Sequence, residues 1–254
     1  MNASTDGILD IRDAGGRLCG RYHYDDPCKS FLRGLYTPKG CDIVAPPSLD
    51  HPHHKGLQYG LCATDVNFWE ESNDPAGRRI GRQVAEKPER FDAGLSQHIV
   101  WRDDVGVSFN ETRRISVQPT TSGYVWSWQT TLTALRDVNL VISAWPQNGG
   151  YCGLGVRLAP ELFLKKSTVT LVPAQQRASG RVPQSVTVRG TKAALTLAQN
   201  TQFQQHVLYI QGCDRNSQDG FAFVSLGPTN GAPCTVRKGA SLQGSYVITV
   251  ADVS

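Results

Sequence analysis

Short segments in which apolar and polar residues alternate run along the whole chain, and glycine or proline ends each one before a helical period develops. Gly94–Arg102 is typical, because Leu95, Gln97, Ile99 and Trp101 fall on one side of an extended backbone. A period of two indicates strands rather than helices. We count roughly fifteen such segments. The sequence therefore predicts an all-β fold, most economically a large antiparallel β-sandwich of two stacked sheets.

The chain of 254 residues shows no internal repeat, low-complexity tract or clear linker. A β-sandwich of this length is often one domain, so we expect a single β-sandwich domain over residues 1–254. Arg113–Val117 and Gly123–Leu132 are expected to form an antiparallel pair, with Trp126 and Trp128 in the core. Pro160–Lys165 is the one short helix expected.

Charge and composition argue against several classes of protein. The net charge is +4, and no basic run exceeds two residues, so we expect no nucleic-acid partner. No apolar run approaches the ~20 residues of a membrane helix, and the N-terminus lacks the features of a secretion signal. We expect a cytoplasmic protein with no membrane partner. The seven cysteines include no C-x-x-C pair, which favours small buried side chains over a zinc knuckle or a disulfide framework.

The stretch from Leu49 to Glu71 contains the densest group of side chains in the chain that can act as acids, bases or ligands. Three of the chain's six histidines, His51, His53 and His54, fall within four residues of this stretch, and Lys55 follows. Imidazole titrates near neutral pH and also binds metals, and nearby carboxylates supply acid, base or ligand chemistry. If the protein has an active site, we expect its floor here.

Pro52 favours an extended backbone, in which His51, His53 and Lys55 share one side and His54 takes the other. His53 would then face a cleft, while His54 would hold a loop near Pro46 and Pro47. Three interpretations stay open: acid–base or substrate-binding histidines, a metal site that uses His51 and His53 with a carboxylate, or a packed histidine cluster. We expect no tightly bound cofactor, although a divalent metal is possible.

Downstream, alternation places Asp65, Asn67, Trp69 and Glu71 on one side of a strand, with Glu70 on the other. An indole beside short polar groups is typical of a sugar-binding surface. The alternative is an Asp/Asn turn followed by a core tryptophan.

Two segments resemble the DUF6807 family, which is also labelled PmoA-like. They contain a D-H-P-H-H-K-G block at Asp50–Gly56, a D-V-N-F-W block at Asp65–Trp69 and a G-L-G-V-R-L-A strand at Gly153–Ala159. The resemblance covers roughly residues 30–162, and the family's C-terminal H-P-x-N and W-H-x-R elements are missing. It implies a galactose-mutarotase-like sandwich and, more loosely, carbohydrate chemistry.

These observations lead to one functional expectation and two alternatives. We expect an isomerase- or lyase-like enzyme that acts by proton transfer on a small carbohydrate-like substrate, such as a sugar or a cyclic polyol or ketone. The alternatives are a metal-dependent enzyme and a non-catalytic carbohydrate-binding sandwich. The expected catalytic residues are His53, His54, Glu70 and Glu71. The expected substrate-binding residues are His51, Lys55, Asp65, Asn67, Trp69 (as a stacking platform) and Arg157.

Overall fold

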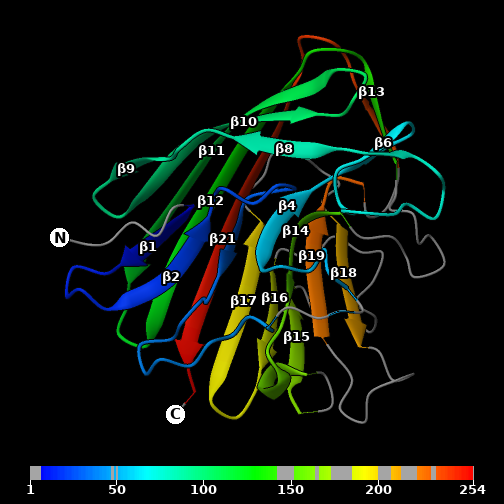
Figure 1. Cartoon of the computed structure of the whole chain (residues 1–254). Helices are drawn as coiled ribbons and strands as arrows, with labels where there is room; N and C mark the ends of the chain where they lie inside the picture. Colours follow the sequence, from blue (N-terminus) through cyan, green and yellow to red (C-terminus); the bar gives the residue numbers. More distant parts are fainter. Residues whose placement is uncertain are drawn as a thin grey trace.

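The computed structural model of the chain consists almost entirely of strands (Figure 1). It describes residues 7–46, 49, 51–141, 152–163, 166–172, 185–199, 207–212, 222–229 and 233–253. Within these residues the helical structure is a single 3-10 turn, Pro160–Leu162, where the short helix was expected. None of the described helices is long and apolar enough to cross a membrane.

The larger sheet has nine strands, and all of its ladders are antiparallel. Its order is β15 (Thr168–Val172), β16 (Ser185–Arg189), β17 (Ala193–Gln199), β21 (Ser241–Asp252), β12 (Gly123–Ala134), β11 (Val107–Pro119), β10 (Gly94–Arg102) and β8 (Arg82–Ala85), with β9 (Glu89–Phe91) also paired to β10. The expected pairing of β11 with β12 is confirmed, and Trp126 and Trp128 are fully buried.

A seven-stranded sheet packs against the first. Its order is β1 (Ile8–Arg12), β2 (Leu18–His23), β3 (Phe31–Arg33), β4 (Leu57–Gly60), β14 (Gly153–Arg157), β19 (Ala222–Gly227) and β18 (Val207–Gly212). The two sheets meet through an apolar core that also holds one buried ion pair, Arg113 with Glu111. Arg113 donates further hydrogen bonds to Tyr22 and to the carbonyl of Ser30, so its guanidinium is also satisfied by hydrogen bonds from the seven-stranded sheet side.

A third, smaller sheet joins short strands in the order β20 (Cys234–Val236), β13 (Val138–Val141), β5 (Cys62–Ala63), β6 (Val66–Asn67) and β7 (Arg79–Ile80). The strand expected over Asp65–Glu71 is therefore only two residues long. Beyond Asn67 the backbone bends, and the side chains that follow do not alternate about one strand axis. The antiparallel β-sandwich itself is confirmed.

The outer face of the seven-stranded sheet carries the histidine-rich stretch. Gly60 on β4 and Gly155 on β14 belong to the same face, because Gln58 is the register partner of Gly155. A Cβ atom at Gly60 would lie 2.8 Å from the Trp69 ring, and one at Gly155 would lie 2.9 Å from it. These two glycines let the indole lie directly on the sheet, which brings residues 67–71 over β4 and β14.

The six cysteines in the described ranges are free. Cys19, Cys62 and Cys152 are buried, and Cys28, Cys41 and Cys234 are partly buried. The burial of Cys19, Cys62 and Cys152 agrees with the small buried side chains that the sequence predicted.

Candidate functional site

The three clustered histidines form a turn, not an extended strand. The amide of His54 donates to the carbonyl of His51 at 3.0 Å, and Pro52 takes the second position of the turn, which proline favours. The ring of His54 stacks on His51 with centroids 4.9 Å apart and meets His53 edge-on at 4.3 Å. The expected separation of His53 and His54 to opposite faces is therefore wrong, because the turn gathers all three rings.

His53 pairs with Glu70. Its Nδ1 lies 2.9 Å from Oε2 of Glu70, and both side chains are about nine-tenths buried, with exposed fractions of 8% and 11%. Burial lowers the pKa of His53, and the Glu70 carboxylate only partly offsets that effect. A neutral imidazole beside a carboxylate carries its proton on Nδ1, so Nε2 bears the lone pair. Nε2 is buried and has no hydrogen-bond partner among the described residues, which makes it an oriented base.

Asn67 fixes the position of Glu70 from within the protein. Its Oδ1 accepts hydrogen bonds from the backbone amides of Trp69 at 2.8 Å and Glu70 at 3.0 Å, and its amide donates to Asp74. Asn67 is fully buried. Both ends of its amide are therefore occupied by the protein, and Asn67 positions the carboxylate instead of binding substrate as the sequence suggested.

Two lysines, Lys29 and Lys55, lie close to the carboxylate of Glu71. Lys29 is 1% exposed; it donates to the carbonyl of Trp69 and lies 3.4 Å from Oε1 of Glu71. Lys55 lies 2.6 Å from Asp26 and 3.0 Å from Oε2 of Glu71. Burial lowers the pKa of Lys29, whereas for Lys55 the hydrogen bonds to Asp26 and Glu71 outweigh burial and raise the pKa. Lys29 and Lys55 thus place two ammonium groups with different pKa values close to the Glu71 carboxylate.

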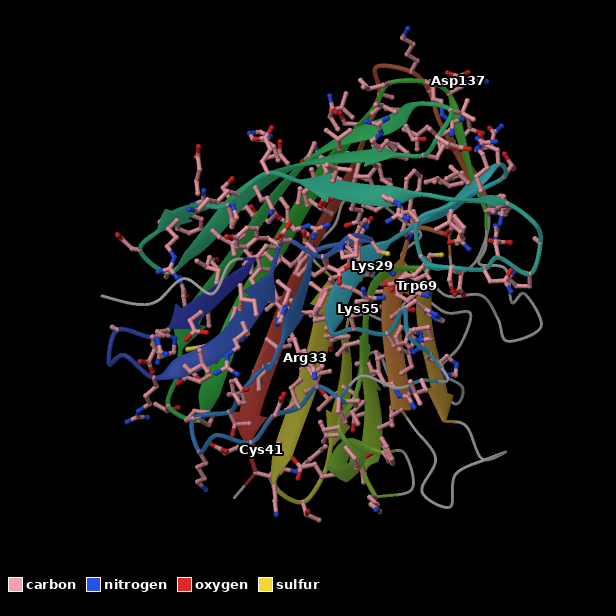
Figure 2. All side chains as sticks on the ribbon, in the orientation of Figure 1. Lys29, Arg33, Cys41, Lys55, Trp69 and Asp137 are labelled. Atoms are coloured by element: carbon pink, nitrogen blue, oxygen red, sulfur yellow. The ribbon has the colours of Figure 1, made fainter. Side chains whose placement is uncertain are left out.

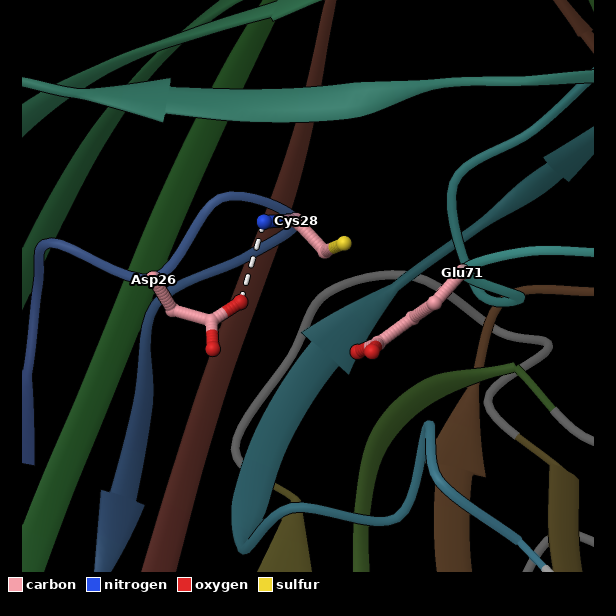
Figure 3. A group of neighbouring side chains, drawn as sticks. All are labelled: Asp26, Cys28 and Glu71. Carbon is pink, nitrogen blue, oxygen red and sulfur yellow. Dashed lines mark hydrogen bonds between the residues drawn. The ribbon is translucent and has the colours of Figure 1, made fainter.

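Asp26, Cys28 and Glu71 have the donor types and spacing of a metal site, with ligand atoms within 4.8 Å of one another. Figure 3 shows the carboxylate of Glu71 directed toward Asp26 and Cys28. The ammonium of Lys55, however, contacts both carboxylates. Burial, with Glu71 nearby, also raises the pKa of Cys28, so its thiol keeps its proton. Lys55 already supplies the positive charge that a cation would bring, so these residues do not suit a metal ion.

His54, from the turn, packs on β19 next to Arg157 of β14. The His54 ring stacks on Phe223 with centroids 4.3 Å apart, and Phe223 is the register partner of Arg157. Burial lowers the pKa of His54 well below its usual value, and the charges of the other two histidines and Arg157 act in the same direction. His54 is therefore neutral near pH 7 and packed against the sheet.

Two other expected substrate-binding residues, Asp65 and Trp69, contact other protein side chains instead. Asp65 precedes β6 (Val66–Asn67) and forms ion pairs with Arg79 at 2.8 Å and Arg136 at 3.0 Å. Trp69 is 1% exposed, and its faces and edges meet His53, His54 and Phe223. A sugar needs an exposed ring face, so Trp69 is a packing residue and not the expected platform.

Asp26 and Lys29 are members of the cluster that the sequence did not reveal. They precede the histidine turn by more than twenty residues and come from the loop between β2 and β3. The carboxylate of Asp26 caps that loop by accepting from the amides of Cys28 and Lys29. Asp-Pro sequences signal turns in general, so no local pattern marks these two as site residues. Figure 2 shows Lys29 and Lys55 near Trp69, around β4.

Comparison with solved structures shows the fold. A putative aldose 1-epimerase from Escherichia coli K12 aligns with a TM-score of 0.54 at 8% identity, over 97% of this chain and 100% of that one. A galactose mutarotase-like protein from Lactobacillus casei aligns with a TM-score of 0.50 at 10% identity, over 97% and 100%. The GH36 α-galactosidase AgaB from Geobacillus stearothermophilus gives 0.52 at 9% identity; this chain is covered completely but spans only 40% of that enzyme.

A search of curated protein sequences found no match to this chain. A protein-family model does match, from residue 12 to residue 254, and its description reads "Family of unknown function (DUF6807)". The match extends well beyond the segment that first suggested the family, through β16 to β21 of the C-terminal region. The chain therefore belongs to the DUF6807 family, with a galactose-mutarotase-like β fold.

Proposed function

We propose that the protein is an enzyme that transfers a proton on a sugar or a related cyclic polyol or ketone, with His53 as the base. The observation that carries the proposal is the buried Nε2 of His53, held by Glu70 through Nδ1 and without a partner among the described residues. A carboxylate that fixes one ring nitrogen and leaves the other as a base is the arrangement that general base catalysis requires.

In this proposal His53 Nε2 takes a proton from a carbon or hydroxyl of the substrate, and the resulting imidazolium is stabilised by the Glu70 carboxylate. The imidazolium then gives a proton to the product or, in an elimination, to the departing oxygen, so no net proton is lost. Lys55, the more exposed lysine at 20%, contributes a donor for a substrate oxygen, and Arg157 contributes a second positive charge near the turn. His51 is the most exposed of the three histidines and is a candidate substrate contact.

The fold supports the carbohydrate part of the proposal. The structural neighbours named above include a putative aldose 1-epimerase and a galactose mutarotase-like protein, and both align over their whole length. At 8–10% identity these neighbours support a class of substrate and no particular reaction. Epimerisation, isomerisation, ring opening and elimination all need the same base and are separated by the product that forms.

The test is an NMR assay of the purified protein with a panel of neutral and acidic sugars in deuterated water. Anomeric exchange, deuterium incorporation at carbon and a new unsaturated product report mutarotation, isomerisation or epimerisation, and elimination, respectively. Loss of the activity in His53→Asn, but not in a control His98→Asn variant at an exposed position, is the expected result. Activity that appears only after addition of Zn²⁺ or Mn²⁺ would favour the metal-dependent alternative at His51 and His53. Binding without any turnover would favour the non-catalytic alternative.

A further inference from the structure

A second feature lies outside the His53 site, at the edge of the sandwich where β1, β2 and β3 approach the segment that leads into β9. It is a cavity of about 920 Å³. This volume is at the upper end of the range for small-ligand sites. Figure 1 shows β1 and β2 below β9 on the side of the molecule where the N-terminus lies.

The lining of the cavity is strongly cationic. Five of its side chains are positively charged, and two, Asp10 and Asp42, are carboxylates. The positively charged residues are Arg12, Arg21, Arg33, Lys87 and Arg90. Register pairing brings Arg21 beside both Asp10 and Arg33 in one cross-strand row. No sequence motif indicates this patch, because its members are scattered over almost eighty residues.

The two carboxylates do not neutralise this charge. Asp10 is shared between Arg12 at 2.7 Å and Arg21 at 3.2 Å. Asp42 forms no ion pair among the described residues, and burial raises its pKa. The guanidinium of Arg33 makes no hydrogen bond or ion pair within the described part of the chain, although Arg33 is partly buried. Asp42 lies within electrostatic reach of Arg33, but a half-buried guanidinium whose N–H groups are not hydrogen-bonded can still receive an anion.

Ring side chains complete the lining. Tyr24, Tyr36 and His23 all border the cavity. Tyr36 accepts a 3.5 Å hydrogen bond from Arg21. Rings with one polar end suit a ligand that has both hydroxyl groups and apolar C–H faces. The cavity therefore offers anion recognition and ring contacts in the same space.

Contacts connect this cavity to the His53 site. His23, on the cavity wall, stacks on Phe31 with centroids 4.8 Å apart. The ammonium of Lys55 lies 6.0 Å from the centroid of the same Phe31 ring. Arg33 and Lys55 are both labelled in Figure 2. The Phe31 ring thus lies between the cationic cavity and Lys55.

We propose that this cavity binds a sugar that bears an anionic group, a carboxylate or a phosphate, with Arg33 as the principal ligand of the anion. The saccharide part rests on the function proposed above, whereas the anion part rests on the charge of the cavity alone. Guanidinium groups bind both oxyanions through paired hydrogen bonds. Arg21 and Lys87 surround the same anion with further positive charge.

Isothermal titration calorimetry at low salt tests the proposal with four probes: glucuronate, glucose 6-phosphate, neutral glucose and inorganic phosphate. We expect glucuronate or glucose 6-phosphate to bind at least tenfold more tightly than glucose and phosphate. We also expect the affinity to fall as salt is added. Whichever of the two anionic sugars binds more tightly identifies the anionic group.

The matched variants are Arg33→Gln and Arg189→Gln, which remove the same charge from the cavity and from an exposed position on β16 of the other sheet. Arg33→Gln should weaken binding about tenfold or more, and Arg189→Gln should leave it unchanged. Equal binding of glucose, equal effects of the two variants or no binding by any probe overturns the proposal. Phosphate that binds as tightly as glucose 6-phosphate overturns the saccharide part. These readouts need no turnover, so they are independent of the role of His53.

Discussion

Nδ1 of His53 and Oε2 of Glu70 lie 2.9 Å apart in a largely buried pair. This contact fixes both the ring orientation and the tautomer of His53, and it leaves Nε2 as the basic atom. The two residues are seventeen positions apart and meet because the histidine turn and the bend after Asn67 pack on the same face of the seven-stranded sheet.

Replacing Glu70 with Gln should lower the pKa of His53 further, because the carboxylate is the group that raises it against burial. The catalysed rate should fall by about 10²–10⁴, the usual contribution of a positioned acid or base. Histidine-selective NMR in wild-type and variant protein measures the pKa and the protonated nitrogen directly. A His53 pKa that rises, or one that does not move, would contradict the assigned contact.

The protein should lose stability as the pH falls below about 6.5. Burial lowers the pKa of both His53 and His54 in the folded state from the usual value of 6.5. The unfolded chain therefore binds protons first, and stability that is full above pH 6.5 declines toward the folded pKa. Each of these histidines contributes a slope of at most about 1.4 kcal/mol per pH unit.

Urea unfolding between pH 5 and 7.5 measures that slope. His54→Phe should flatten it, because Phe keeps a ring against Phe223 and cannot take a proton. His98→Phe is the control, since it removes an imidazole from an exposed position. A steeper slope in His54→Phe than in the wild type would be inconsistent with a neutral buried His54.

Lys29→Met should destabilise the fold by about 3–5 kcal/mol. Lys29 is almost completely buried, and its removal leaves the Trp69 carbonyl without its donor and takes away one of the two ammonium groups beside Glu71. Lys238→Met, at an exposed position, should change the free energy of unfolding by less than about 0.5 kcal/mol. Equal stabilities of the two variants in urea unfolding would refute the role given to Lys29.

Gly155→Ala should cost about 1–3 kcal/mol because its Cβ would lie 2.7 Å from Phe223 and 2.9 Å from Trp69. Gly106→Ala is the matched control, since a Cβ there meets nothing within 4 Å. The difference in unfolding free energy between the two variants measures how tightly Trp69 lies on the sheet. If both substitutions are equally tolerated, the close approach does not exist.

Divalent metals should not stabilise the wild-type protein through Asp26, Cys28 and Glu71, because Lys55 lies against both carboxylates. Lys55→Ala removes that ammonium and should create measurable Zn²⁺ affinity at the same residues. Thermal denaturation with added Zn²⁺, followed by a chelator, compares the two proteins. Strong Zn²⁺ stabilisation of the wild type that disappears in Cys28→Ala would show that metal displaces the lysine.

The strand architecture was predictable because alternation is a local property. The segment Gly94–Arg102 has the same bounds in the sequence interpretation and in the structure, and its predicted inward side chains are buried. The alternation pattern gave a wrong prediction over Asp65–Glu71. There Asn67 Oδ1 accepts hydrogen bonds from two backbone amides, and the strand ends. The pattern also failed over His51–His54, since Pro52 is equally compatible with a turn and with extended backbone.

The site was predictable in part. His53, Glu70, Glu71 and Lys55 belong to one dense stretch, and the structure brings them together. Asp26 and Lys29 join them only through tertiary packing of a loop that carries no distinctive motif. The cationic cavity depends on cross-strand register between β1, β2 and β3, which a single sequence does not specify.

The central claim is that His53 Nε2 is the catalytic base. Asn at position 53 places an amide N–H near Nδ1 and can keep the bond to Glu70, while it removes Nε2. We expect His53→Asn to lose at least about 100-fold in sugar turnover by the NMR assay, with a melting temperature close to that of the wild type. Full turnover by His53→Asn, with folding intact, would contradict the account.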